Sequence, residues 1–178
     1  MKIVKRILIG VAFLVAVPLI VALFVRTDFA VEREVIINKP KADVFNYVRY
    51  LRNHASFSKW ELMDPKMKKD YKGADGTVGF VSAWDSDNQD VGKGEQEIKR
   101  ITEGERIDVE IRMRSPFQST DPAYMTTESL GDNQTRVRSG YLGKMNYPTN
   151  LICLFVADKI GKDMETGLIN LKTVLEKQ

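Results

Sequence analysis

The sequence contains one cysteine and one histidine, and both scarcities exclude whole classes of protein. A disulfide needs two cysteines and a structural zinc site needs four Cys or His ligands, so a single chain cannot form either one. Glycine (12 residues) and proline (6 residues) are also few, while 43% of the 178 residues are hydrophobic. This composition excludes collagen-like, low-complexity and disordered proteins, and predicts one globular domain with at most an appendage.

The basic excess of the chain comes from its first 27 residues. The formal net charge is +3, and the basic residues up to position 27 are accompanied by no acidic residue: Lys2, Lys5, Arg6 and Arg26. The rest of the chain holds 23 basic against 24 acidic residues. Because this remainder has no positive excess for a phosphate backbone, we expect no nucleic-acid partner.

A run of 19 residues without a charge extends from Ile7 to Val25. At 1.5 Å per residue a helix of this length covers roughly 28 Å, close to the ~30 Å apolar core of a bilayer. The basic flank before the run and the lack of an A-x-A pattern after it favour an uncleaved transmembrane anchor over residues 1–27. A cleaved signal peptide is the main alternative, and a buried core helix is the third.

The distribution of Lys and Arg also predicts an orientation. Three basic residues and the amino terminus precede the apolar run, and only Arg26 follows it directly. The positive-inside rule then predicts a cytoplasmic N-terminus and a globular part in the periplasm or outside the cell. The single Cys153 is compatible with such an oxidising compartment.

The pattern over residues 28–178 predicts one α+β domain. Seven strands are expected from alternating or β-rich runs, at residues 29–37, 66–71, 77–84, 93–102, 106–114, 123–130 and 134–143. Asn38 is expected to cap a helix that begins at Pro40, and the apolar spacing over 149–176 predicts a long C-terminal helix. The apolar stripe of that helix must pack on one face of an antiparallel sheet.

Five segments carry a resemblance to a known superfamily. They are VEREVIINKPKADVFNYV (31–48), FSKW (57–60), GTVGFVSAW (76–84), GKGEQEI (92–98) and GLINLKTVLEK (167–177). In this order and spacing the chain resembles the START-like superfamily, also called helix-grip or SRPBCC proteins, and within it the polyketide cyclase/dehydrase and lipid-transport branch. The resemblance implies a curved seven-stranded antiparallel sheet around the long C-terminal helix, with a hydrophobic tunnel between them. It implies neither a fixed activity nor a cofactor.

We expect part of the aromatic and methionine side chains, with a few hydroxyls, to line the tunnel and bind a hydrophobic small molecule or lipid. The candidate ligand-binding residues are Trp60, Phe80, Trp84, Met113, Met125, Ser139, Tyr141 and Phe155. No set of residues forms a recognisable catalytic motif, so no catalytic residue is assigned.

Other polar residues have both a functional and a structural interpretation. His54 could be a general base, but a solvated loop histidine is favoured. Glu95 and Glu97 lie two apart on one strand face, where cross-strand ion pairs are favoured over a catalytic pair of acids. The DSDNQD segment (85–90) fails the EF-hand pattern, which favours a solvated hairpin loop, and no metal site is expected.

Two further features complete the candidates. Four arginines could form an anion site, although a ladder of alternating charges that includes Glu128 is favoured: Arg112, Arg114, Arg136 and Arg138. Cys153 is interpreted as a small buried side chain, since a nucleophilic thiol needs a basic partner.

Three functions remain open from the sequence. The leading hypothesis is a membrane-anchored, non-catalytic domain that binds a lipid or a polyketide-like compound. The alternatives are a cyclase or dehydratase that moves protons with a tunnel-facing acid, Tyr141 or His54, and a membrane-tethered module that recruits a partner protein through the outer face of the sheet.

Overall fold

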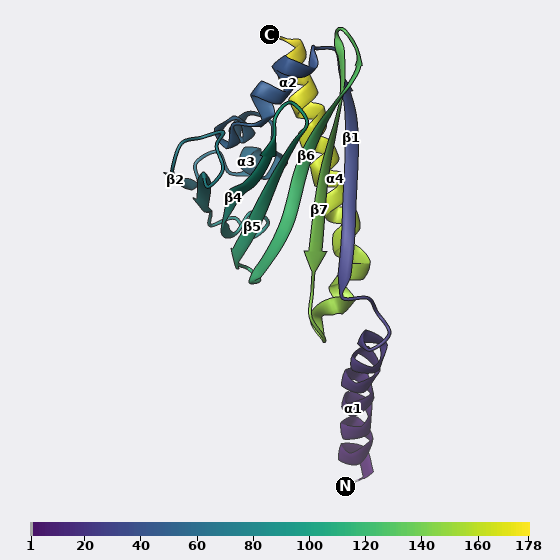
Figure 1. Cartoon of the computed structure of the whole chain (residues 1–178). Coiled ribbons are helices and arrows are strands. Elements are labelled where there is room, and N and C mark those ends of the chain that lie inside the picture. The colour runs from purple at the N-terminus through teal and green to yellow at the C-terminus, as the bar shows by residue number, and fades with distance from the viewer. Residues whose placement is uncertain (1) are drawn as a thin grey trace.

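A seven-stranded antiparallel sheet curves around one long helix in the computed structural model, which describes residues 2–178 (Figure 1). The strands lie in the order β1-β7-β6-β5-β4-β3-β2. Their bounds are β1 (Asp28–Ile37), β2 (Lys68–Lys72), β3 (Val81–Asp85), β4 (Lys93–Thr102), β5 (Arg106–Ser115), β6 (Ser119–Gly131) and β7 (Gln134–Lys144). The helix-grip architecture expected from the sequence is confirmed.

The helices lie at both ends of the chain and between β1 and β2. They are α1 (Lys2–Ala22), α2 (Lys41–Val48), the 3-10 helix η1 (Leu51–Ser56), α3 (Lys59–Met63), the 3-10 turn η2 (Thr149–Ile152) and α4 (Cys153–Glu176). Asn38 does not cap α2, because Pro40 occupies the N-cap position. The backbone N–H of Asn38 instead donates to Glu176 Oε1 at 2.7 Å, which ties the end of β1 to the end of α4.

Two strands begin four residues away from the start that the alternation predicts. β3 begins at Val81 and not at residue 77, because Gly76 and Gly79 adopt φ values of 74° and 87° and turn the chain. Val78 is therefore exposed rather than inward-facing. β6 begins at Ser119, four residues before the expected start, and this extension places Asp121 on the inner face of the sheet.

The tightly packed core lies at the end of the domain farthest from α1. Leu168, Leu171 and Leu175 of α4 pack there with buried side chains of α2 and the sheet. That part of the core comprises Ile37, Val44, Phe45, Val48, Ile107 and Val137. Complete burial of an aliphatic or aromatic side chain contributes about 1.5–3 kcal/mol, so this end supplies most of the apolar stabilisation.

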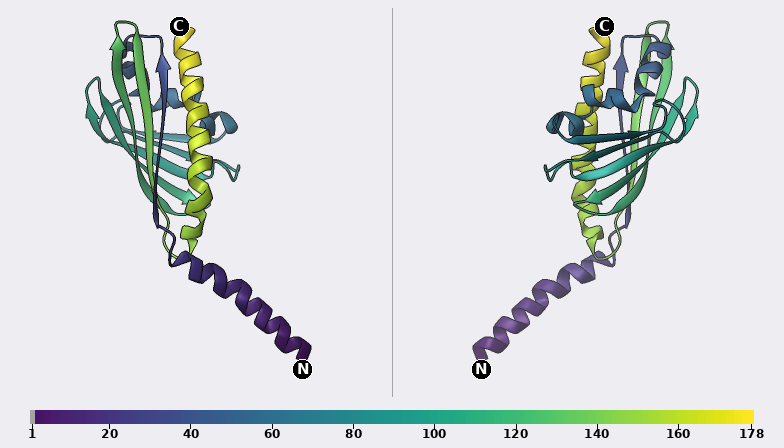
Figure 2. Two further views of the ribbon diagram at one scale, coloured as in Figure 1. Left: turned by 90° about the vertical axis from the view of Figure 1, so that its right-hand side faces the viewer. Right: turned by 90° about the vertical axis from the view of Figure 1, so that its left-hand side faces the viewer.

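Helix α1 extends away from the sheet at the opposite end. Figure 2 shows that it leaves obliquely, next to the start of α4. Its segment Ile3–Ala22 is long and apolar enough to cross a membrane, with a mean hydropathy of 2.3. The most apolar 18-residue stretch of this segment contains no buried residue. The interpretation of this segment as a buried core helix is therefore wrong.

Candidate functional site

A cavity of about 330 Å³ lies between the inner face of the sheet and the middle of α4, from Ile160 to Leu168. The sheet side of its wall is formed by Ile107, Val109, Ile111, Met113, Ala123, Met125, Ser139 and Tyr141. The helical side includes Ile160, Met164, Gly167 and Leu168, and the third side includes His54, Phe57, Trp60, Met67, Trp84 and Val91. This volume and apolar lining are typical of a small-molecule site.

The cavity exists because α4 lies closest to one edge of the sheet. Its main sheet neighbour is β1, the edge strand, and the Arg33 side chain of β1 passes directly against Gly161. A Cβ atom at Gly161 would lie 2.3 Å from Arg33 Nη2, so glycine permits this close approach. Strands β4 to β6 curve away from the helix, and side chains from the region of α3 do not fill the space between them.

One end of the cavity carries a buried polar pair. Tyr141 Oη donates a hydrogen bond of 2.6 Å to Asp121 Oδ2, and Asp121 Oδ1 accepts one of 3.3 Å from the backbone N–H of Lys144. Asp121 is only 3% exposed. Burial raises the pKa of Tyr141, and the hydrogen bond to Asp121 raises it further, so the phenol remains a neutral donor.

His54 supplies a second polar group to the cavity wall. Its Nε2 atom is closed off from solvent and has no hydrogen-bond partner among residues 2–178, while its ring packs against Phe57 with 4.9 Å between centroids. Burial lowers the pKa of His54 to about 4, and the nearby Lys69 contributes in the same direction against the opposing effect of Asp75. The imidazole is therefore neutral at physiological pH.

Ion pairs lie beside the cavity where η1, α3 and the β3–β4 loop approach α4. Glu61 lines the cavity and pairs with Lys69, and both side chains are largely buried. Asp90 of the β3–β4 loop pairs with Lys159 of α4 at 2.5 Å, and these two side chains are exposed. The second pair joins two walls of the cavity, and its exposure means that separating the two charges costs little.

Six of the eight candidate residues lie on the cavity wall, from five separate elements: Trp60, Trp84, Met113, Met125, Ser139 and Tyr141. Phe80 does not line it, because its fully buried ring is stacked on Tyr71 in the core. Phe155 does not line it either, because it lies in the first turn of α4 and is 74% exposed. The cavity position expected for these two phenylalanines is wrong.

The charged residues form ion pairs on the outer face of the sheet. Arg112 bonds to Glu95, Glu97 and Glu110, while Arg136 and Arg138 contact Glu34 and Glu128. The interpretation as ion pairs and a charge ladder is confirmed. In the DSDNQD segment, Asp85 pairs with Lys93 and Asp90 with Lys159. Over residues 2–178 no three His, Cys, Asp or Glu side chains are placed to hold a metal ion.

Cys153 is half-buried at the start of α4, close to the carbonyl oxygen of Thr27. Burial raises the pKa of its thiol, which disfavours the nucleophilic thiolate. This environment agrees with a structural role for Cys153 and offers no activating base.

Two residues of the cavity region escaped the sequence-based assignment. The solvated loop position expected for His54 is wrong, because His54 lies in the 3-10 helix η1, where it is half-buried between the buried Leu51 and Phe57 and lines the cavity. Asp121 lies before the expected start of its strand, although continuing the alternation back from Ala123 places it on the inner face.

No protein-family model and no curated protein matches the sequence. Solved structures do match its fold. Norcoclaurine synthase from Thalictrum flavum has a TM-score of 0.64 at 9% identity, over 85% of this chain and 95% of that one. The protein MLL2253 from Mesorhizobium loti has a TM-score of 0.61 at 15% identity, over 84% of this chain and 98% of that one. Ara h 8.0201 has a TM-score of 0.55 at 14% identity, over 85% of this chain and 99% of that one. At these identities the likenesses show the helix-grip fold and nothing beyond the fold.

Proposed function

We propose that this protein is a membrane-anchored domain that binds a hydrophobic small molecule, of lipid-like or polyketide-like chemistry, in the cavity between the sheet and α4. The observation that carries the proposal is the cavity itself, whose wall is mainly apolar and also holds polar and charged side chains, among them His54, Glu61, Gln96 and Asp163. Apolar lining provides affinity for a hydrophobic body, and isolated polar groups orient it.

The polar groups narrow the class of ligand. His54 lines the cavity as a neutral imidazole, which has one donor and one acceptor nitrogen and is therefore suited to a hydroxyl or amide group on the ligand. The Tyr141 hydroxyl already donates to Asp121, which leaves its oxygen lone pair for a second donor. We therefore propose a largely apolar ligand that carries a few hydrogen-bonding groups, at least one of them a donor to the Tyr141 oxygen.

The anchor is supported by the contacts at the end of α1. Asn150 is buried, and its Nδ2 donates to the carbonyl oxygens of Ala22 and Val25 at 2.7 and 2.8 Å. A helix end leaves such carbonyls without intrahelical partners, so Asn150 caps α1. Cleavage after α1 would remove part of this contact, which favours an anchor over a signal peptide. With the basic residues before the span, we propose a cytoplasmic N-terminus and a globular domain outside the cytoplasm.

The ligand proposal is tested with the full chain purified in mild detergent from its native host, by native mass spectrometry and extraction of bound lipids. A stoichiometric hydrophobic molecule is expected. The matched variants are Ala123→Trp, which fills the cavity from β6, and Thr120→Trp, which adds the same ring to the exposed outer face of the same strand. Only Ala123→Trp should lose the molecule. Equal retention by both folded variants, or a wild-type protein without any bound molecule, contradicts the proposal.

A catalytic function is the second candidate, and one observation favours it. His54 lines the cavity as a neutral imidazole, the protonation state that a general base requires. Once a ligand is identified, His54→Ala should abolish its conversion and leave its binding measurable if the protein is an enzyme. A ligand that remains chemically unchanged after incubation with the wild-type protein excludes this candidate.

A further inference from the structure

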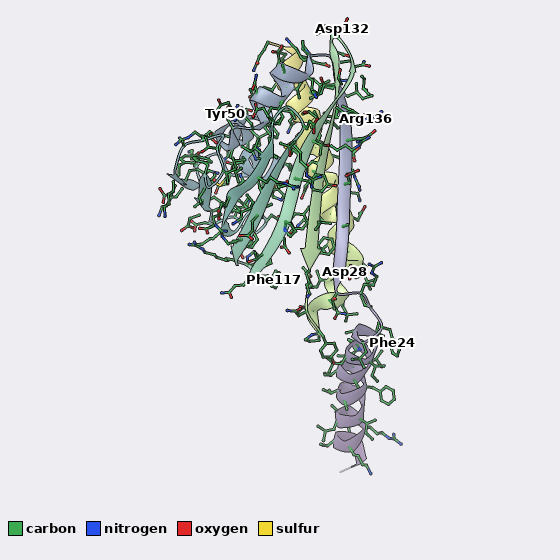
Figure 3. All side chains as sticks on the ribbon, viewed as in Figure 1. Phe24, Asp28, Tyr50, Phe117, Asp132 and Arg136 are labelled. Atoms are coloured by element: carbon green, nitrogen blue, oxygen red, sulfur yellow. The ribbon has the colours of Figure 1, made fainter. Side chains whose placement is uncertain are left out.

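Exposed apolar side chains gather at the end of the domain from which α1 emerges. Phe117 is 60% exposed at the β5–β6 turn, Tyr147 is 49% exposed in the loop before η2, and Leu154 and Phe155 are 59% and 74% exposed in the first turn of α4. We call these four residues the collar. Figure 3 shows Phe117 near the level of Asp28, above Phe24 and at the opposite end of the domain from Tyr50 and Asp132.

The collar has a fixed position relative to the end of α1. Asn150 holds the carbonyls of Ala22 and Val25, and the backbone N–H of Met145 donates to the oxygen of Thr27 at 2.8 Å. Leu154 follows Asn150 by four residues, which corresponds to about 6 Å along an α-helix. If α1 spans a bilayer up to Ala22, the first turn of α4 must therefore lie close to the bilayer surface.

Charge at this end does not oppose contact with lipid headgroups. Asp28 is paired with Arg26 at 3.0 Å, and Asp158, one turn beyond the collar on α4, is paired with Lys162 at 2.7 Å. These two exposed carboxylates are thus each paired with a basic residue, while Asp121, the carboxylate nearest to Phe117 along the chain, is buried against Tyr141. Aromatic and leucine side chains above such a surface are typical of segments that lie in the membrane interface.

We propose that the collar is a second membrane-binding surface, which inserts into the headgroup region of the same bilayer that α1 crosses. This inference rests on the proposed anchor. The domain then lies on the membrane instead of moving freely above it. Ile160, just over one turn beyond Phe155 on α4, lines the cavity, so the wall of the cavity begins next to the lipid.

The experiment places single spin labels on the full chain in nanodiscs of phosphatidylcholine and phosphatidylglycerol. Cys153→Ala provides a background without native thiols, since Cys153 is the only cysteine. The collar sites are Phe117→Cys and Phe155→Cys. The matched control is Ile169→Cys, an equally exposed apolar position at the far end of α4, and Leu14→Cys reports on α1. The accessibility of each label to oxygen and to a water-soluble nickel complex gives its depth.

Both collar labels should show an oxygen-to-nickel accessibility ratio at least about threefold above that of Ile169→Cys, and below that of Leu14→Cys. A deep Leu14 label with collar labels as aqueous as Ile169→Cys overturns the collar and leaves the anchor intact. An aqueous Leu14 label overturns the anchor itself. If the Cys153→Ala background does not fold, Phe155→Trp and Ile169→Trp in bilayers with brominated lipid chains make the same comparison, and equal quenching of the two overturns the collar.

Discussion

The two halves of α4 face the same sheet but differ greatly in how many of their residues are buried. From Met164 onward, the helix buries Met164, Gly167, Leu168, Leu171 and Leu175, whereas from Cys153 to Asp163 only Gly161 is buried. The second half packs into the core with α2 through Leu168, Leu171 and Leu175, whereas the cavity borders the middle of the helix, from Ile160 to Leu168. Cys153, the first residue of the helix, lies beside Thr27. The last turns of α4 therefore contribute most of its packing, and the turns before Met164 can change with little loss of stability.

The largest difference between the halves should appear in truncations of buried side chains. Leu171 is fully buried, so Leu171→Ala should lower the free energy of unfolding by roughly 2–5 kcal/mol through lost burial and a new void. The measurement is chemical denaturation of the full chain in detergent micelles, followed by circular dichroism. Ile169→Ala, which removes an exposed side chain from the same turns, is the control and should cost about 0.5 kcal/mol or less.

The free energy of unfolding should depend on pH through His54, which lies beside the cavity. Its pKa is about 4 in the folded protein against 6.5 unperturbed, so the unfolded chain binds a proton first as the pH falls. Stability is complete above pH 6.5 and is lost progressively down to pH 4, by about 2 kcal/mol between pH 7 and pH 5. His54→Gln should flatten this part of the pH profile. Parallel profiles for the two proteins would show that His54 is not buried as a neutral group.

Loss of the hydrogen bond at the polar end of the cavity should lower the free energy of unfolding by a smaller amount. Tyr141→Phe removes the donor to the buried carboxylate of Asp121, which should cost about 1–2 kcal/mol in denaturation at pH 7. Tyr124→Phe is the matched control, since its hydroxyl donates to Glu32 on the outer face, where water can replace it. An equal loss of stability in both variants would mean that the end of the cavity does not shield Tyr141 and Asp121 from solvent.

The smallest effect is expected at the start of α4. Phe155→Ala removes a larger side chain than Leu171→Ala, yet it should change the free energy of unfolding by less than about 0.5 kcal/mol because Phe155 has almost no protein neighbours to lose. The same denaturation assay checks it. A loss of stability as large as that of Leu171→Ala would show that the start of α4 is packed as tightly as its end.

Periodicity in the sequence was sufficient for the sheet and for the packed half of α4. The stripe Ile160, Met164, Leu168, Leu171 and Leu175 proceeds in steps of three and four, and all five face the sheet or the cavity. Phe155 precedes Ile160 by five residues, which rotates it about 140° from that stripe. Its exposed position was therefore present in the spacing, although its size and apolar character suggested otherwise.

The candidate site was less accessible to such reasoning. Alternation identified the inward faces of β5 and β7, which supply Met113, Ser139 and Tyr141. It could not identify which inward residues pack and which border empty space, because that depends on how far α4 lies from each strand. Phe80 and Trp84 share one face of the β3 segment, yet η1 and Tyr71 cover the first while the second borders the cavity.

The strand order has a consequence for the sequence of events in folding. β1 follows α1 directly in the chain but pairs only with β7, so that Asp28 lies opposite Lys144. The hairpins from β2 to β7 connect neighbours along the chain and close short loops, whereas β1 must wait for a partner that is synthesised more than a hundred residues later. Of the seven strands, β1 thus emerges first from the ribosome and is the last to complete its hydrogen bonds.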